Sequence, residues 1–463
     1  MKNPLSFLIL AFSLLCSFNL LAQWESIGSG FSTGQSGQRE VFSISVVNES
    51  TIWATPVTND FTQTYDFIKT EDGGISWQEG SLPDTIGAYF PGNIFALDAN
   101  TAWVTMISLP GQDLIKIFKT VDGGLSWVEQ NGEFNSPGFA FATLHFFNEN
   151  EGLGFGSPGT GIQSIDSLQI FRTTDGGENW NRVPPASLPS PLAGEGVWVY
   201  SGNSSYEVQG DSIWFVTRAS RVFRSIDKGA SWDAFNAGIS GSASAPGLSS
   251  IAFENASNGI VVTFQPSRAA RTTDGGATWE TIEIPASLSL GAIEHIPGTT
   301  DTYLINDGFA GSSNMLLTTD GGITWETLTH PPSMNCMQFI SPTVGFGGGA
   351  INPANDLGMY MWTGNLSDSP TTNTLEAQPT PTLALYPNPA KESITVEMTE
   401  NIMSANSIIA EVLSVDGRLI QTTTYAAQLN RLEIPVSRLK SGLYLLRLKT
   451  EEGTLAVKRF TKT

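Results

Sequence analysis

One short turn motif occurs six times in this sequence at a spacing close to 50 residues, and this period limits the possible folds more than any other feature. The first copy reads KTEDGGISW at residues 69–77, and the last reads TTDGGITW at residues 318–325. Every copy contains an Asp followed five residues later by a Trp. The aspartates are Asp72, Asp122, Asp175, Asp227, Asp274 and Asp320, and the tryptophans are Trp77, Trp127, Trp180, Trp232, Trp279 and Trp325. A fixed period of this length is typical of an array of identical folding units.

Four apolar runs fill each period. The second period reads NIFALDAN, TAWVTMIS, IKIFKTVDGG and WVEQNG. Four short strands in about 50 residues predict one blade of a β-propeller. Abundant Gly (47) and Pro (25) with only 14% charged residues suit short strands joined by many turns.

The two ends of the repeat region predict the number of blades. After Trp325 the chain supplies three more strand-like runs, MNCMQFIS, VGFGGGA and GMYMWTG, and no fourth. Near the start, QWESI at residues 23–27 resembles the run that follows the motif elsewhere, such as WETI and WETL. We therefore expect Trp24 to enter the last blade and to close a ring of seven blades.

The motif itself is interpreted as a structural turn. Asp and Ser/Thr side chains accept hydrogen bonds from nearby backbone amides, and Gly supplies positive φ. Only the first Gly of the pair varies, to Lys228, so we expect the second Gly to carry the stricter requirement. Six sites spread around a ring do not converge on one substrate, and one carboxylate per repeat is too few for calcium. We expect no catalytic, cofactor or metal residues in the motif.

The sequence of the motif closely resembles the Asp-box, or BNR repeat, and this resemblance covers residues 23–365. That family includes sialidases, sortilin-like receptors and propellers similar to photosystem II assembly factors. The sequence pattern DGG-x-x-W looks most like that of the last group. The resemblance implies the fold and little about activity, because the family contains both enzymes and binding proteins. The sequence lacks the Arg-Ile-Pro motif of sialidases, which puts that activity in doubt.

A ligand is expected on the face opposite the repeated turns. The variable second-to-third and fourth-to-first connections share that face. Candidate contacts in or near these loops are Phe90, Glu195, Trp198, Tyr200 and Tyr206. The alternative is that such rings only hold the loops against the blades.

The N-terminal segment, residues 1–22, reads as a secretory signal peptide because one Lys precedes an apolar run that ends at Ala22. Removal of this segment leaves Cys336 as the only cysteine, so we expect no intrachain disulfide. Residues 23–365 contain 12 Lys and Arg against 34 Asp and Glu. This acidity disfavours nucleic acid and anionic membranes as partners.

Two further segments follow the predicted propeller. Residues 366–382 are rich in Pro and Thr and read as a linker. Residues 383–463 contain strand runs separated by turns, which predicts a small Ig-like β-sandwich. Four segments of this region resemble the type IX secretion sorting domain of Bacteroidetes: YPNPA, VDGR, LKSGLYLLRL and VKRFTK. The resemblance implies Sec export, contact with the type IX machinery and a secreted or cell-surface location.

Together these observations predict an all-β protein, a seven-bladed β-propeller followed by the sandwich. The leading functional hypothesis is a non-catalytic module that binds a glycan or a protein, with no cofactor. The alternative is a glycoside hydrolase, sialidase-like or acting on another polysaccharide, with carboxylates on the variable-loop face.

Overall fold

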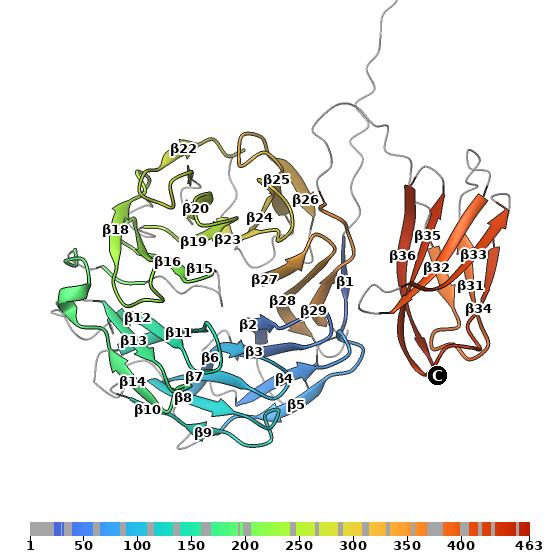
Figure 1. Ribbon diagram of the computed structural model, residues 1–463, viewed down its shortest axis with the longest axis horizontal. Coiled ribbons are helices and arrows are strands. Elements are labelled where there is room, and N and C mark those ends of the chain that lie inside the picture. The colour runs from blue at the N-terminus through green and yellow to red at the C-terminus, as the bar shows by residue number, and fades with distance from the viewer. Residues whose placement is uncertain are drawn as a thin grey trace, which may run out of the picture.

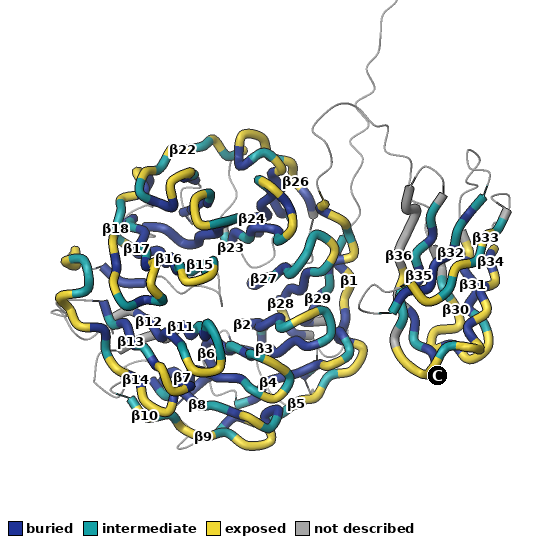
Figure 2. The backbone as a smooth tube through the Cα atoms, in the orientation of Figure 1, coloured by how far each residue is buried: buried dark blue, intermediate teal, exposed yellow. Residues whose placement is uncertain are grey.

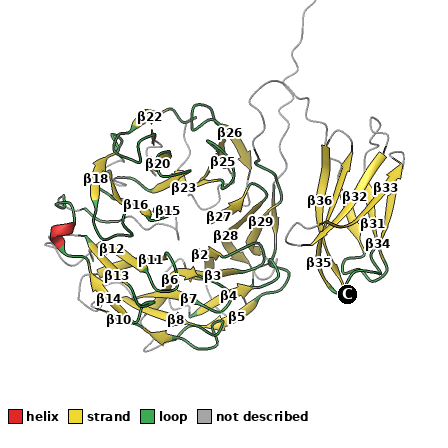
Figure 3. Cartoon of the chain, in the orientation of Figure 1, coloured by secondary structure: helices red, strands yellow, loops and turns green. Residues whose placement is uncertain are grey.

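The computed structural model contains seven blades arranged in a ring, together with two sheets formed by the C-terminal residues (Figure 1). Pairing of residues 39–40 with residues 350–351 joins the first and seventh blades into one sheet. It describes residues 23–28, 30–31, 39–58, 65–83, 89–108, 115–132, 139–158, 168–192, 195–197, 205–240, 247–263, 268–285, 290–307, 314–329, 334–352, 357–367, 383–398, 407–414, 419–426, 431–450 and 453–463. The all-β, seven-bladed prediction is confirmed, and Figure 3 shows strands in every blade.

Each blade has four antiparallel strands in sequence order from the inside of the ring outwards. The first three blades consist of β2(Arg39–Val46), β3(Ile52–Thr58), β4(Asp66–Thr70), β5(Gln78–Ser81); β6(Tyr89–Ala96), β7(Ala102–Ser108), β8(Ile115–Thr120), β9(Val128–Glu129); and β11(Phe139–Phe146), β12(Gly152–Pro158), β13(Gln169–Thr173), β14(Asn179–Arg182). The short β10(Asn131–Gly132) pairs in parallel with β14.

The next three blades repeat the same order. They consist of β15(Tyr206–Gln209), β16(Ser212–Val216), β17(Arg221–Ser225), β18(Asp233–Asn236); β19(Ser250–Phe253), β20(Gly259–Thr263), β21(Arg268–Thr272), β22(Glu280–Ile282); and β23(Leu290–His295), β24(Tyr303–Asp307), β25(Asn314–Thr318), β26(Glu326–Thr329). A 3-10 turn at Pro185–Ser187 lies between the third and fourth blades.

The seventh blade joins the two ends of the ring. Its strands β27(Met334–Ser341), β28(Val344–Asn352) and β29(Leu357–Trp362) are completed by β1(Trp24–Ser26). Trp24 pairs with Trp362 and Ser26 with Tyr360 in an antiparallel register. The indole of Trp24 is 5% exposed and lies 5.4 Å from the ring of Trp362. The N-terminal strand therefore closes the ring, as the sequence predicted.

Burial follows the position of a strand within its blade (Figure 2). All seven residues of β3 are buried because neighbouring blades cover both faces of the second strand. The outermost strands are mainly exposed, as in β5, whose residues read QEGS. This gradient explains why the inner runs of the sequence are continuously apolar while the outer ones are polar.

The C-terminal residues form two packed sheets. One contains β30(Leu383–Tyr386), β31(Ser393–Met398) and β34(Arg431–Pro435). The other contains β33(Leu419–Ala426), β32(Ser407–Ser414), β35(Gly442–Thr450) and β36(Gly453–Lys462) in that order. Their facing side chains, including Ile394, Val412 and Phe460, are essentially inaccessible to solvent. The predicted β-sandwich is confirmed.

Candidate functional site

The six repeated turns share one hydrogen-bond pattern. In the first, the Thr70 hydroxyl donates to Asp72 Oδ1 at 2.7 Å and accepts the Gly74 amide at 2.9 Å. Asp72 Oδ1 also accepts the Ser76 amide at 2.9 Å, and Oδ2 accepts the Ser76 hydroxyl at 2.6 Å. Equivalent contacts recur in the other five copies at nearly the same distances, with the Asn179 side-chain amide replacing the hydroxyl donor in the third copy. Each carboxylate thus holds its own turn closed.

These hydrogen bonds keep the carboxylates ionised. Donation from Ser126 lowers the pKa of Asp122 to about 2, and donation from Thr278 does the same for Asp274. A carboxylate whose oxygens accept several donors is a poor general acid or base near neutral pH. The chemistry of the motif aspartates therefore favours a structural role.

The two glycines of the motif face different constraints. Gly123 and Gly124 have φ of 75° and 88°, and Lys228, which replaces the first Gly in the fourth copy, has φ of 53°. A φ near 55° is the left-handed well that other residues enter at moderate cost, whereas 88° lies outside it. A Cβ on Gly124 would also lie 2.3 Å from Phe67 Cζ. The stricter demand therefore falls on the second Gly.

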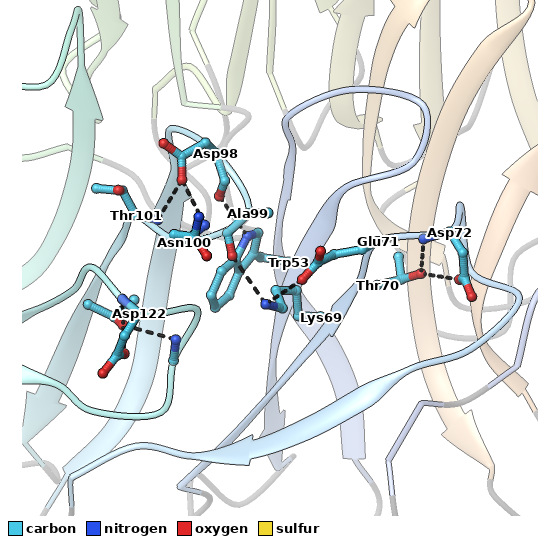
Figure 4. A network of polar contacts seen from close by, with 12 residues as sticks. Trp53, Lys69, Thr70, Glu71, Asp72, Asp98, Ala99, Asn100, Thr101 and Asp122 are labelled. Atoms are coloured by element: carbon cyan, nitrogen blue, oxygen red, sulfur yellow. Dashed lines mark hydrogen bonds and ion pairs between the residues drawn. The ribbon is translucent and has the colours of Figure 1, made fainter. Parts of the chain in front are cut away.

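Cations next to the turns link one blade to the next (Figure 4). Lys69 is buried, lies 5.1 Å from the centre of the Trp53 ring, and donates to the Ala99 carbonyl of the following blade at 3.1 Å. Lys119 and Arg224 reach the following blade in the same way, at Gly176 and Gly275. The indole N–H of Trp53 reaches the same loop at Asp98. These cations stabilise the seams between blades.

The inner strands are linked by side chains that each accept a hydrogen bond from a backbone amide of the next blade. Ser45 Oγ accepts from Ala96, Gln338 Oε1 accepts from Val46, and Glu294 Oε1 accepts from Phe339, at 2.9, 2.9 and 3.2 Å. Sequence reasoning did not find these links. Their signal was a polar residue at the equivalent position of several inner strands.

Two glutamates of the inner strands have perturbed titration. Both residues, Glu207 and Glu294, are partly buried. Burial raises the pKa of Glu207 to about 7 and raises the pKa of Glu294 well above its usual value. The charge of Glu207 raises the pKa of Glu294 further, so the two groups interact.

The predicted ligand residues do not form one exposed cluster in the described part of the chain. Glu195 is buried, with a side chain that pairs with Arg221 and accepts the Thr217 hydroxyl at 2.9 Å. It fixes the end of a loop to the fourth blade, where Val197 bridges to Thr217. Glu195 therefore anchors this loop to the fourth blade by its contacts with Arg221 and Thr217.

The aromatic candidates are partly described. Phe90 is 3% exposed and packs with Phe42, Val57 and Ile107 between the first two blades. Tyr206 is half-buried and donates its hydroxyl to the Leu144 carbonyl of the preceding blade at 3.3 Å. Trp198 and Tyr200 lie outside the described residues.

The inner strands are irregular near the variable-loop face. A break in register occurs at Val41–Ser43, Pro91–Ile94, Ala140–Thr143, Leu290–Ile293 and Met334–Cys336. Bulges of this kind are frequent beside binding and active sites. None of these five segments contains an Asp or Glu. The bulged rim is built from apolar, Gly, Ser, Thr, Asn and Cys residues.

The described residues contain neither a metal-binding cluster nor a membrane-spanning helix. No three His, Cys, Asp or Glu side chains in those ranges lie close enough to hold a metal ion. The same ranges contain no helix long and apolar enough to cross a membrane. Burial raises the pKa of the Cys336 thiol to about 12, so it remains protonated.

The C-terminal sandwich matches a known domain family. Residues 384–462 match the secretion system C-terminal sorting domain. This match identifies the sandwich as a sorting domain and implies export and an interaction with the secretion machinery. No curated protein matches the sequence.

Most of the chain resembles solved structures in fold. YCF48 bound to D1 peptide is 17% identical, with a TM-score of 0.51 over 75% of this chain and 97% of that one. The extracellular domain of the one-component system BT4673 from B. thetaiotaomicron is 11% identical, with a TM-score of 0.50 over 95% of this chain and 57% of that one. At these identities the similarity shows the fold alone. The GH93 α-L-arabinofuranosidase of Fusarium graminearum, at 14% identity over 73% of this chain and 98% of that one, has a TM-score of 0.44, too low to carry an argument.

Proposed function

We propose that this protein is a type IX secretion product whose propeller binds a glycan or a protein on its variable-loop face without catalysing a reaction. The sorting domain supports the export step. Residues 1–22 are proposed to be removed as a signal peptide, so that the mature chain begins at Gln23 and its propeller spans residues 23–365. Mass spectrometry of the intact exported protein tests whether residues 1–22 are removed and whether the tail at 383–463 is retained.

The observation that carries the proposal is the bulged rim. Glycoside hydrolysis usually requires two carboxyl groups that face one opening. The five irregular segments of the inner strands provide none. Gly92 packs closely against Thr105 and Ile107. Ser43 and Asn93 accept hydrogen bonds from backbone amides of neighbouring blades. A rim without carboxyl groups in these segments suits binding without acid–base catalysis.

One solved structure with a similar fold provides a precedent for a peptide ligand. The propeller of YCF48 has been determined with the D1 peptide bound. We extend the possibility of a peptide ligand to this chain as part of the proposal, beside the glycan ligand. The acidity of residues 23–365 favours a neutral or basic ligand over an anionic one.

Direct binding tests this proposal. The exported protein is applied to a glycan array and to an array of random peptides, beside a Trp198→Ala/Tyr200→Ala variant. A Leu125→Ala variant is the control, because Leu125 is 80% exposed on a repeated turn at the opposite face. We expect at least one ligand class to bind the wild type and the control and to lose about tenfold in affinity in the double variant. Absence of any bound ligand, or equal loss in the control, contradicts the proposal.

A glycoside hydrolase remains the second candidate, because Glu207 and Glu294 interact and have raised pKa values. A protonated carboxylic acid near a second carboxyl group is the arrangement that such enzymes use. This candidate predicts hydrolysis of some polysaccharide by the wild type and loss of it in Glu207→Gln. A broad panel with no reducing-sugar release argues against it.

A further inference from the structure

The C-terminal sandwich has four sheet edges, and three of them are protected. Exposed edges are liabilities that proteins cover, shorten or mark with charge and proline. The edge strand β36 is covered at its end by residues 388–390. The Ala390 amide donates to the Thr461 carbonyl at 2.8 Å, and Asn388 Oδ1 accepts the Thr461 amide at 2.8 Å. Lys458 and Arg459 add charge along the same strand.

The edges of the smaller sheet are also protected. β30 has only four residues and is followed directly by Pro387. β34 contains Arg431, Glu433 and a terminal Pro435. Its carbonyls are occupied as well, because Tyr425 and Gln421 donate to those of Glu433 and Pro435 at 2.6 and 3.0 Å. A new strand would find few free groups there.

The fourth edge, β33, has none of these protections. It is eight residues long, reads LIQTTTYA, and contains no charge and no proline. Among the described residues it pairs on one side only, with β32. Its outward side chains are exposed, with Leu419 at 52% and Ile420 at 41%. Thr422 and Thr424 are exposed along the same strand.

We propose that β33 is the docking edge of the sorting domain, to which an extended segment of the secretion machinery adds as a further strand. The sorting-domain match supplies the class of partner, because the domain interacts with that machinery. Backbone pairing along an uncharged strand, with apolar contact at Leu419 and Ile420, requires no particular charge on the partner. Residues 366–463 are balanced in charge, with 10 basic and 10 acidic residues, which agrees with recognition by pairing.

The test is export of the full chain in a bacterium that carries the type IX system. The edge variant is Thr422→Lys/Thr424→Lys, since edge lysines block strand addition in natural sheets. The control is Ser437→Lys/Ser441→Lys, which adds the same charge at two exposed turn positions. A third variant, Thr422→Val/Thr424→Val, keeps the strand uncharged and β-branched. Thermal unfolding of each purified variant establishes that the sandwich is folded.

We expect the lysine edge variant to be retained in the cell at least tenfold more than the wild type, and the control and valine variants to be exported within twofold of it. Normal export of a folded lysine edge variant overturns the proposal. A dimer by light scattering that the edge lysines abolish, with normal export, assigns the edge to a second copy instead. The inference rests on the proposed export, and failure of the wild type to reach the medium or cell surface identifies failure of that assignment.

Discussion

Substitution of Trp24 by Ala is expected to weaken the closure of the ring. The Trp24 indole is 5% exposed and meets the rings of Phe339 and Trp362 at 5.7 and 5.4 Å. An aromatic side chain that buries 150–250 Å² loses about 4–6 kcal/mol of transfer free energy, and Trp→Ala substitutions in cores cost about 3–5 kcal/mol. We therefore expect the free energy of unfolding to fall by about 3–5 kcal/mol.

This loss has a measurable thermal signature. A unit of about 340 residues unfolds with an entropy near 0.7 kcal/mol per kelvin, so the loss corresponds to a decrease in Tm of about 4–7 °C. Differential scanning calorimetry of the full chain measures it. The control is Glu25→Ala, because Glu25 is exposed in the same strand, and its Tm is expected to change by less than about 1 °C. A Trp24→Ala protein that melts with the wild type would refute the account of ring closure.

Four further predictions concern the turns, the inner ring and the loop anchor. The pKa of all six motif aspartates is lowered on folding, so their stabilisation is fully present only above about pH 5 and is lost as pH falls towards about 2, which chemical unfolding at each pH measures. The pKa of Glu207 is raised to about 7, so its contribution to stability falls as pH rises from about 4.5 to 7, and Glu207→Gln should reduce the slope of the profile in that window, where Glu294 also contributes. Gly124→Ala places a methyl group against Phe67 at a φ of 88° and should reduce the free energy of unfolding by about 2–4 kcal/mol, whereas a loss below 0.5 kcal/mol would show that the turn relaxes. Glu195→Ala leaves the half-buried Arg221 without its carboxylate and should increase hydrogen exchange at residues 195–197, while unchanged exchange there would contradict its role as an anchor.

The architecture of the propeller was readable from the sequence because it is periodic. Six spaced aspartates gave the repeat length, and the orphan strand at Trp24 together with the incomplete last blade gave the number seven. Both depend on local signals, the turn chemistry and the apolar runs, which tertiary contacts do not alter.

The inner ring was not predictable in the same way. Ser45, Gln338 and Glu294 occupy equivalent positions and make equivalent links, but their side chains differ in type and length, so no motif marks them. Burial of Phe90 and pairing of Glu195 depend on neighbours from other blades or distant loops. Exposure of a loop residue cannot be judged from its own segment when its partners lie far along the chain.

A disulfide between the two ends of the ring tests the central claim most directly. Glu25 and Met361 are opposite each other in the antiparallel pair of β1 and β29, where Cα atoms lie about 4.5–5.5 Å apart and a disulfide can form. In the Glu25→Cys/Met361→Cys protein, the account predicts one cross-linked peptide by mass spectrometry without reduction. Glu25→Cys with Glu326→Cys, an exposed position in another blade, should give none. Absence of the cross-link in the first pair, or equal cross-linking in both, would contradict closure of the seventh blade by the N-terminal strand.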